Sequence, residues 1–367
     1  MAGRDACPTS APAALGSRPA RGAYPWRVPR PRVVITEPLD PEAVAWLAAR
    51  CEVIEASIDD EAALDDALRT ADALIVRTYT RVDEALLARA PRLRVVGRAG
   101  VGLDNVDVDA CRARGVVVVF TPEANTSAVV EYIWSQILGA VRPIEALDRA
   151  LSLDEWRGAR DTSLAARELS ELTLGILGMG RIGRAVARVG ATLMGRVIYH
   201  DLVEIEPGER AGATPVDREA LLAESDILTI HVDGRAANRG LIGAAECALL
   251  KRGVVVLNAS RGFVVQPAAL AAFLRERRDA LAILDVHDPE PFSGDYPLLG
   301  LPNARLHPHI AAGTVRAKKN MSRVVEQVWG ALAEETGEVH HRGAEGAEER
   351  EGKMGDGRGR EGKRRVG

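Results

Sequence analysis

The stretch LTLGILGMGRIGRAVARVGA, residues 172–191, decides the fold of this chain. It begins with an apolar run that is typical of a buried strand and ends with a helical pattern. Between them, Gly178, Gly180 and Gly183 form the spacing G-x-G-x-x-G. The first glycine permits a tight turn, the second lets a pyrophosphate approach the backbone, and the third lets helix and strand pack closely. The stretch therefore predicts a dinucleotide-binding turn, with the phosphates at the helix N-terminus.

The strand that follows, RVIYHD, ends in Asp201, whose carboxylate would accept hydrogen bonds from an adenosine ribose and repel a 2′-phosphate. No Lys or Arg occurs from Val197 through Glu209, and Glu204 and Glu206 add negative charge. The pattern favours NAD over NADP as the cofactor. The alternative is that Asp201 is an ordinary turn residue at a strand end.

Short β-branched runs alternate with helical stretches on both sides of the glycine loop, first in residues 32–121 and again from residue 172. Strand, helix and strand at this spacing indicate parallel pairing with right-handed crossovers. The sequence thus predicts an α/β fold with two doubly wound parallel-sheet domains. A later helix has an apolar face and is expected to return to the first domain. That face consists of Met321, Val324, Val325, Val328 and Leu332.

The predicted domain boundaries follow from this alternation. Residues 32–121 plus 309–336 form a substrate domain, and residues 122–308 form an NAD-binding domain. Residues 337–367 mix Gly, Glu and Arg with almost no apolar residues, which predicts a disordered tail. We expect no regulatory domain after this point.

The N-terminal residues 1–31 are rich in Ala, Pro and Arg, with Asp5 as the only acid. They lack the apolar segment of a secretory signal. We expect a disordered extension or a misassigned start. An organelle transit peptide is the alternative, although the prolines of this segment would break an amphipathic helix.

The composition excludes several classes of protein. Of the 367 residues, 47% are hydrophobic, which is enough to bury a sizeable core. The net charge of -4 gives no basic field that would attract nucleic acid or an anionic membrane. The four cysteines lie far apart, which argues against a disulfide framework and against a zinc site. We expect a cytoplasmic protein with no nucleic-acid or membrane partner.

Polar residues follow successive strands of the second domain. Arg261 follows one strand, Asp285 and Glu290 follow the next, and His309 lies on the segment after that. Ligands of open α/β sheets bind at these carboxyl ends. A histidine titrates in the range needed to take a hydroxyl proton, and a nearby carboxylate raises its pKa. An arginine can hold a substrate carboxylate by two parallel hydrogen bonds. The pattern indicates the oxidation of a hydroxy acid.

His307 and His309, in the run HPH, share one face of a strand and could chelate a metal together. No third cluster of ligands is evident in the sequence. Glu290 and Arg261 give His309 a better role in proton transfer. We therefore expect His309 to carry the proton, His307 to be structural or rim-lining, and no metal site.

The chain resembles the D-isomer-specific 2-hydroxyacid dehydrogenases over about residues 32–335. The motifs that carry the resemblance are GRAGVGLDNVD, LGILGMGRIGRA, LNASRGFVV, LDVHDPEP and HPHIAAGT. The D-3-phosphoglycerate dehydrogenase branch is the most similar. The resemblance implies a flavodoxin-like substrate domain and a Rossmann NAD-binding domain, with the active site in a cleft that closes and excludes water.

The resemblance also implies a role for each candidate residue. Arg261 would bind the substrate carboxylate, and Glu290 would pair with the catalytic His309. Asp285 would contact the nicotinamide carboxamide. Backbone amides of one loop would hold the substrate carboxylate, and these belong to Gly100, Val101 and Gly102. The remaining cofactor-binding positions, besides the three glycines and Asp201, are Arg181, Ile182 and Ala259.

Two further arginines match positions near the substrate in the phosphoglycerate branch. They are Arg77 and Arg98, and two guanidinium groups would suit a phosphate dianion. Their alternative role is that of solvated or carbonyl-capping arginines. We expect His231 to be a packed strand-end residue. Asp104 and Asn105 are expected to shape their loop by local hydrogen bonds rather than to touch substrate.

The predicted function is that of an NAD-dependent D-2-hydroxyacid dehydrogenase, acting on D-3-phosphoglycerate or phosphohydroxypyruvate in serine biosynthesis. A glyoxylate or hydroxypyruvate reductase is the near alternative. Formate oxidation is disfavoured because that branch resembles a Gln and His pairing, whereas residue 290 is Glu. A non-catalytic, NADH-sensing, corepressor-like binding protein is the third possibility.

A homodimer is the predicted assembly. Helix TSAVVEYIWSQIL, residues 126–138, is apolar nearly all round, including Ile133, Trp134 and Ile137. A helix of this kind needs cover on more than one side. We expect one of its faces to meet a second subunit.

Overall fold

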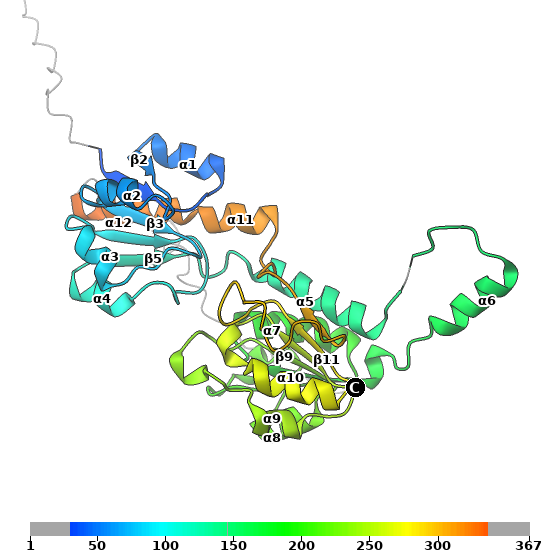
Figure 1. Cartoon of the computed structure of the whole chain (residues 1–367). Coiled ribbons are helices and arrows are strands. Elements are labelled where there is room, and N and C mark those ends of the chain that lie inside the picture. Colours follow the sequence, from blue (N-terminus) through cyan, green and yellow to red (C-terminus); the bar gives the residue numbers. More distant parts are fainter. Residues whose placement is uncertain (1–29, 145, 337–367) are drawn as a thin grey trace, which may run out of the picture. The chain divides into compact units, whose positions relative to one another are not determined.

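The computed structural model describes residues 30–144 and 146–336, which build two parallel sheets (Figure 1). The disordered extension predicted at residues 1–31 lies almost wholly outside the described residues, and so does the tail predicted at residues 337–367. Within the described ranges, no helix has the length and apolar character needed to cross a membrane.

The first sheet has five strands in the order β2-β1-β3-β4-β5, and every neighbouring pair is parallel. This is the flavodoxin-like order. Its strands are β1 (Arg32–Ile35), β2 (Glu52–Glu55), β3 (Ala73–Val76), β4 (Val95–Arg98) and β5 (Val117–Phe120). The helices between them are α1 (Pro41–Ala48), α2 (Glu61–Leu68), α3 (Glu84–Arg89) and α4 (Val108–Ala113).

Each of these four helices starts after an aspartate. The aspartate carboxylate accepts a backbone N–H of the first helical turn, which would otherwise have no partner. The capping residues are Asp40, Asp60, Asp83 and Asp107. The sequence therefore marks the starts of α1 to α4 with the same residue type.

The C-terminal segment forms two helices, α11 (Val315–Ser322) and α12 (Val324–Thr336), and α12 returns to the first sheet (Figure 1). Met321, expected on the same face, belongs to α11 and is buried with Ala128 of α5 (Thr126–Val141) instead. Val324 and Val328 are fully buried in one cluster with Val33 of β1. A Cβ atom at Gly97 in β4 would lie 2.4 Å from Cγ2 of Val328. Gly97 is therefore what lets α12 approach the sheet closely.

The second sheet has seven strands in the order β12-β11-β10-β9-β6-β7-β8, again all parallel. They are β6 (Thr173–Leu177), β7 (Arg196–His200), β8 (Thr214–Pro215), β9 (Ile227–Ile230), β10 (Val255–Asn258), β11 (Leu281–Leu284) and β12 (Ala304–Leu306). Its strand order reverses between β6 and β9, as in a Rossmann fold. Both predicted parallel-sheet domains are thereby confirmed.

Helices cover both faces of the second sheet. They are α5 (Thr126–Val141), α7 (Arg181–Leu193), α8 (Arg218–Glu224), α9 (Ala244–Leu249) and α10 (Pro267–Glu276). Helix α6 (Leu153–Thr162) and the 3-10 turns η1 (Leu169–Glu171), η2 (Pro207–Glu209), η3 (Ala236–Asn238) and η4 (Gly262–Val264) complete the described elements.

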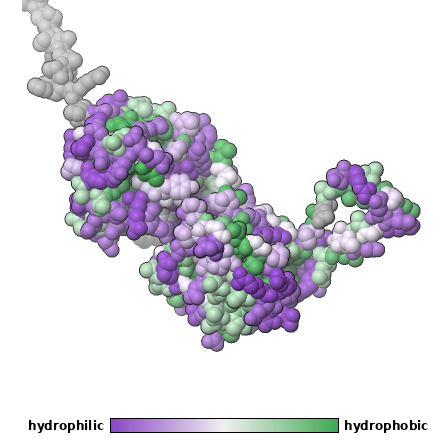
Figure 2. Space-filling model, viewed as in Figure 1, coloured by the Kyte–Doolittle hydropathy of each residue, from purple (hydrophilic) through white to green (hydrophobic). Residues whose placement is uncertain are grey.

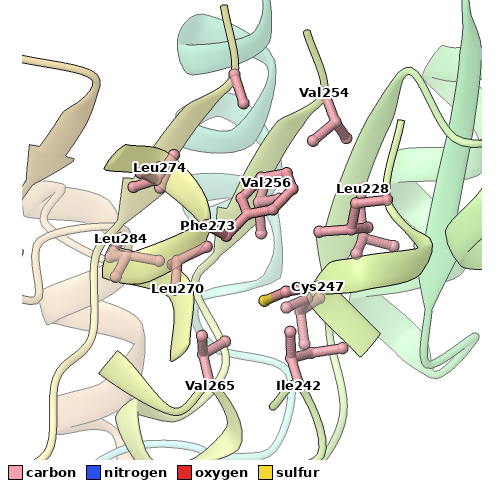
Figure 3. Packing of buried hydrophobic residues seen from close by; sticks show 14 of the residues in the cluster. Leu228, Ile242, Cys247, Val254, Val256, Val265, Leu270, Phe273, Leu274 and Leu284 are labelled. Atoms are coloured by element: carbon pink, nitrogen blue, oxygen red, sulfur yellow. The ribbon is translucent and has the colours of Figure 1, made fainter. Parts of the chain in front are cut away.

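Neighbouring residues of β10 point to opposite faces of the second sheet, because side chains alternate along a strand. Val256 packs with Leu270 and Phe273 of α10, as Figure 3 shows, whereas Leu257 packs with Ile133 of α5.

The three residues of α5 that were expected to support a subunit interface are buried within this chain. Ile133, Trp134 and Ile137 all lie in the core between α5, α7 and the sheet. These three residues therefore do not form the face that was expected to meet a second subunit, and that expectation stays a prediction for the rest of the helix. Of the large apolar residues on α5, Leu138 is the exposed one.

The segment around α6 presents apolar side chains to solvent. No residue of α6 is buried, and Figure 1 shows the helix on an extended excursion of the chain. In Figure 2 hydrophobic and hydrophilic residues alternate over this excursion. The exposed large apolar residues on it are Ile144, Leu147, Leu153, Trp156 and Leu164. A short helix of this kind is marginal in water without a packing partner.

Candidate active site

The structure brings His309 and Glu290 into contact, with 2.8 Å between Nδ1 of His309 and Oε2 of Glu290. The other carboxylate oxygen of Glu290 accepts the backbone N–H of His287 at 2.7 Å. Burial alone would raise the pKa of Glu290, but the hydrogen bonds from His309 and His287 lower it. The hydrogen bond to Glu290 raises the pKa of His309, although desolvation and the charge of Arg261 oppose this. The pair therefore favours an imidazolium facing a carboxylate.

The backbone of His309 is held by Asp285. His309 has φ 55°, in the left-handed region, and its N–H donates to the carbonyl of Asp285 at 2.8 Å. The two carboxylate oxygens of Asp285 accept the N–H groups of Ile310 and Ala311, each at 2.8 Å. A non-glycine residue at positive φ needs such support. Asp285, which was expected to contact nicotinamide, has both oxygens engaged with this turn.

Arg261 lies at the end of β10 and is bound to a carboxylate from the first domain. Its Nε and Nη2 atoms lie 2.8 Å and 2.6 Å from Oδ2 of Asp104, and Nη1 donates to the carbonyl of Ser260 at 2.7 Å. A Cβ atom at Gly102 would lie 1.8 Å from Nη2 of Arg261. The loop that holds Gly100, Val101 and Gly102 is thus placed beside the guanidinium group.

The glycine loop has the geometry of a pyrophosphate cradle. Gly178 has φ 95°, and a Cβ atom there would lie 2.8 Å from the backbone of His231 and Val232 at the end of β9. A Cβ atom at Gly183 would lie 2.2 Å from the carbonyl oxygen of Gly178. The corresponding position at Gly180 meets no atom within 4 Å.

The start of α7 supplies the donors for such a cradle. Gly180 is the N-cap residue and has no side-chain cap, so the first N–H groups of the helix are left for a ligand. Arg181 is the first helical residue, and its Nε donates to the hydroxyl of Thr126 at 3.0 Å. Ile182 and Ala259 pack against the core of this domain. These residues fit a bound dinucleotide, whose nicotinamide would supply the hydride acceptor or donor.

A pocket of about 270 Å³ lies beside Asp201. It is lined by Tyr199, Asp201, Val203, Glu204, Arg210, Pro215 and Val216. Asp201 accepts the N–H of Met179 at 2.6 Å and the N–H of Val203 at 3.0 Å, which fixes the carboxylate between the glycine loop and the pocket. The position suits recognition of an adenosine ribose.

The comparisons with known proteins agree with this geometry. Residues 134–311 match the description "D-isomer specific 2-hydroxyacid dehydrogenase, NAD binding domain". The glyoxylate reductase of Aeropyrum pernix is 38% identical over 319 residues, which cover 83% of this chain and 93% of the relative. The chain belongs to the D-isomer specific 2-hydroxyacid dehydrogenase family. This confirms the predicted family and the predicted NAD cofactor.

Two further proteins illustrate the range of this dehydrogenase family. The D-3-phosphoglycerate dehydrogenase of Archaeoglobus fulgidus is 36% identical over 81% of this chain, but the chain spans only 56% of that relative. A solved structure, the TT0316 protein of Thermus thermophilus, has 31% identity and a TM-score of 0.70, covering 83% of this chain and 97% of the other. The relatives have different substrate names, so family membership leaves the substrate open.

The two additional arginines, Arg77 and Arg98, differ in their surroundings. Burial, and then the charge of Arg261, lowers the pKa of Arg98 to about 10. The Nε of Arg98 is buried without a hydrogen-bond partner among the described residues. Arg77 instead donates to the carbonyl of Pro38 at 3.0 Å, which is the carbonyl-capping arrangement. Asn105 ties two loops together through the carbonyls of Arg77 and Thr80.

His307 and His231 have partners apart from the Glu290 and His309 pair. His307 Nδ1 lies 2.6 Å from the hydroxyl of Tyr132, whereas Glu290 is the partner of His309. Burial lowers the pKa of His231, and its Nε2 lies 2.9 Å from the hydroxyl of Thr229. Both therefore have structural contacts within the described part of the chain.

Two residues near the candidate site were not recognised from the sequence. Asp104 was assigned to loop shaping, but it also pairs with Arg261 from the other domain. Arg210 directly follows the stretch from Val197 through Glu209, which has no Lys or Arg, and it lines the pocket beside Asp201. The position of Arg210 in the sequence, nine residues after Asp201, is the signal that indicates it. No local signal in the sequence pairs Asp104 with Arg261.

Proposed function

We propose that this chain is an NAD-dependent D-2-hydroxyacid dehydrogenase, which transfers a hydride between NAD(H) and a 2-hydroxy or 2-keto acid. The observation that carries the proposal is the 2.8 Å contact between His309 and Glu290, in a fold that also holds the glycine cradle. In oxidation, a bound nicotinamide would accept the hydride of the C–H bond, and Nε2 of His309 takes the hydroxyl proton. Glu290 stabilises the imidazolium that forms.

The substrate carboxylate is assigned to Arg261, whose guanidinium can bind it bidentately and polarise the adjoining carbonyl. Backbone N–H groups of Val101 and Gly102 add donors to the same group, whereas the N–H of Gly100, also expected to do so, donates to the carbonyl of Arg98 at 2.8 Å. Asp285 acts by fixing the turn at His309 and by presenting its charge to the cofactor side. The active site is proposed to lie between a substrate domain, residues 32–121 plus 309–336, and an NAD-binding domain, residues 122–308.

We favour a substrate with a second anionic group, as in D-3-phosphoglycerate or phosphohydroxypyruvate. Arg98 supports this. Its buried guanidinium and that of Arg261 repel each other, and an added anion would stabilise both. Such a substrate would place the enzyme in serine biosynthesis. Reduction of glyoxylate or hydroxypyruvate is the second candidate. It is supported by the similarity to the glyoxylate reductase of Aeropyrum pernix, 93% of which is covered.

The assembly is proposed to be a homodimer. Its support is the set of exposed apolar side chains around α6, including Leu153 and Trp156, together with Leu138 on α5. A cytoplasmic location is proposed from the three buried free thiols among the described residues, Cys51, Cys111 and Cys247. Unpaired thiols of this kind suit a reducing compartment.

A substrate panel tests the proposal. NADH oxidation is followed with phosphohydroxypyruvate, hydroxypyruvate, glyoxylate and pyruvate, and NAD reduction is followed with formate. The expected result is the highest kcat/KM with phosphohydroxypyruvate. NADH binding without turnover on any of these compounds would support a cofactor-sensing protein instead.

Arg98→Met separates the two substrate candidates. We expect kcat/KM for phosphohydroxypyruvate to fall about 100-fold, because one guanidinium contact to the dianion is lost. The value for glyoxylate should change by less than about threefold. Arg77→Met is the matched control, since Arg77 already caps a carbonyl and should affect neither substrate strongly. Equal losses with both substrates would contradict a dianion site at Arg98.

A further inference from the structure

His287 lies in the loop between β11 and β12 and contacts the three segments that carry Arg261, Glu290 and His309. The residue is buried, and its backbone N–H and both ring nitrogens have partners. A buried imidazole with every nitrogen engaged is part of the interior rather than a group for substrate.

The backbone of His287 fixes one end of the Glu290 carboxylate. Its N–H donates to Oε1 at 2.7 Å, while Nδ1 of His309 donates to Oε2 of the same carboxylate at 2.8 Å. A carboxylate held at both oxygens cannot rotate without losing one of these bonds. The direction in which Glu290 faces His309 therefore depends on where the backbone of His287 lies.

The side chain of His287 reaches the segment that carries His309. Its Nε2 lies 2.9 Å from the carbonyl oxygen of His307. A carbonyl can only accept, so Nε2 must carry the hydrogen. In the neutral ring, Nδ1 then accepts from the hydroxyl of Tyr296, 3.3 Å away. The Nε2 bond links the Glu290 loop to the residue that precedes Pro308 and His309.

Packing leaves the imidazole no room to move. The ring of Phe292 lies edge-on at 4.7 Å and that of Tyr296 at 5.5 Å between centroids. A Cβ atom at Gly262 would lie 1.9 Å from the carbonyl carbon of His287. Gly262 follows Arg261 directly, so the backbone of His287 also sets the position of the arginine segment.

We propose that His287 is a positioning residue, which holds the Glu290 and His309 pair and the Arg261 segment in one geometry without touching substrate. The proposal rests on the proposed function, because the geometry matters only if His309 transfers a proton. Small displacements in such a site have large effects, since a misplacement of about 1 Å can cost about 100-fold in rate.

Three variants test the bond from Nε2 to His307. His287→Phe keeps the ring packing and removes the donor, and His287→Gln restores an amide N–H near Nε2. Tyr296→Phe is the matched control, because it removes the partner of Nδ1 only. We expect kcat/KM to fall about tenfold or more in His287→Phe and to recover largely in His287→Gln. Tyr296→Phe should change it by less than about threefold, and NADH affinity should be unchanged in all three.

A second measurement does not depend on turnover. The pKa of His309 is read from an NMR titration of protein labelled at histidine, with its resonance assigned by its loss in His309→Asn. The charged groups that face His309 are Glu290, Asp285 and Arg261. We expect the raised pKa of His309 to fall toward the ordinary histidine value in His287→Phe, because Glu290 is no longer held against it.

The two measurements distinguish failure of the positioning role from failure of the proposed function. Absence of turnover in the unaltered protein would count against the function alone, since the titration still reports the pair. A His287→Phe protein with unaltered kcat/KM and unaltered His309 titration would overturn the positioning role. If His287→Phe does not fold, His287→Asn replaces it, because its shorter amide cannot reach the carbonyl of His307.

Discussion

Nε of Arg261 donates to Oδ2 of Asp104 at 2.8 Å, and Nη2 lies 2.6 Å from the same oxygen in an ion pair. Burial would raise the pKa of Asp104, but the hydrogen bond from Arg261 lowers it, so the carboxylate stays ionised at neutral pH. The guanidinium that we assign to the substrate carboxylate is therefore already paired with an anionic side chain of the protein, that of Asp104. A substrate must displace this anion or share the guanidinium with it.

Asp104→Asn is expected to lower KM for 2-keto acids by about three- to tenfold, because the competing charge is removed while the shape is kept. Steady-state kinetics with NADH at saturation measure this. Asp109→Asn is a suitable control, since Asp109 is an exposed carboxylate bound to Arg112. A rise in KM would mean that Asp104 mainly orients Arg261 and does not compete with substrate.

The parts of this site that are local in sequence could be predicted. The three glycines, Asp201 and the strand ends at Arg261 and Glu290 each follow a recognisable strand. Parallel strands bring their carboxyl ends to one edge, so the order of the residues along the chain indicates which of them meet. The contact between His309 and Glu290 is an example, because both lie on segments that follow neighbouring strands.

Contacts between distant segments could not be predicted in this way. Asp104 and Arg261 belong to different sheets, and no periodicity links them. The neighbours of the buried residues of α5 could not be predicted for a related reason. A helix that is apolar on two sides needs two neighbours, but the sequence does not say whether the second is another subunit or a helix of the same chain. Here α7 and the sheet provide the cover.

Glu290→Gln is expected to reduce kcat/KM about 100-fold, because the imidazolium loses its counter-charge. The pH dependence should also change. Reduction of a keto acid needs protonated His309, so its rate falls as the pH rises through the pKa of His309. Glu290 raises that pKa, and its removal should move the fall to lower pH. The measurement is kcat/KM for keto-acid reduction across the neutral pH range.

The control for this experiment is Asp288→Asn, a neighbouring carboxylate that pairs with Arg239 rather than with His309. It should keep the profile of the unaltered enzyme. An unchanged profile in Glu290→Gln would show that the titrating group is not His309 paired with Glu290.

Asp201→Ala is expected to raise the ratio of kcat/KM for NADPH to kcat/KM for NADH about 100-fold, because the carboxylate that repels a 2′-phosphate is lost. Arg210 lines the same pocket and would then face the phosphate. The double variant with Arg210→Ala should lose most of this gain. The kcat/KM values for both cofactors, with one keto acid at saturation, give the ratio. A ratio that stays low in Asp201→Ala would show that pocket shape, rather than charge, excludes NADPH.

Gly183 and Gly180 should respond differently to the same change, although both belong to the glycine loop. A Cβ atom at Gly183 would lie 2.2 Å from the carbonyl oxygen of Gly178, so Gly183→Ala must separate helix from strand. We expect the free energy of unfolding to fall by about 1–3 kcal/mol.

At Gly180 the position meets no atom of the protein, and φ is -71°, which alanine adopts without strain. Gly180→Ala should therefore keep its stability within about 0.5 kcal/mol and lose about tenfold in NADH affinity, because the methyl group fills the space where the pyrophosphate approaches. Denaturant unfolding and NADH fluorescence titration measure the two effects separately. If Gly180→Ala binds NADH as the unaltered protein does, the dinucleotide does not pass over this glycine.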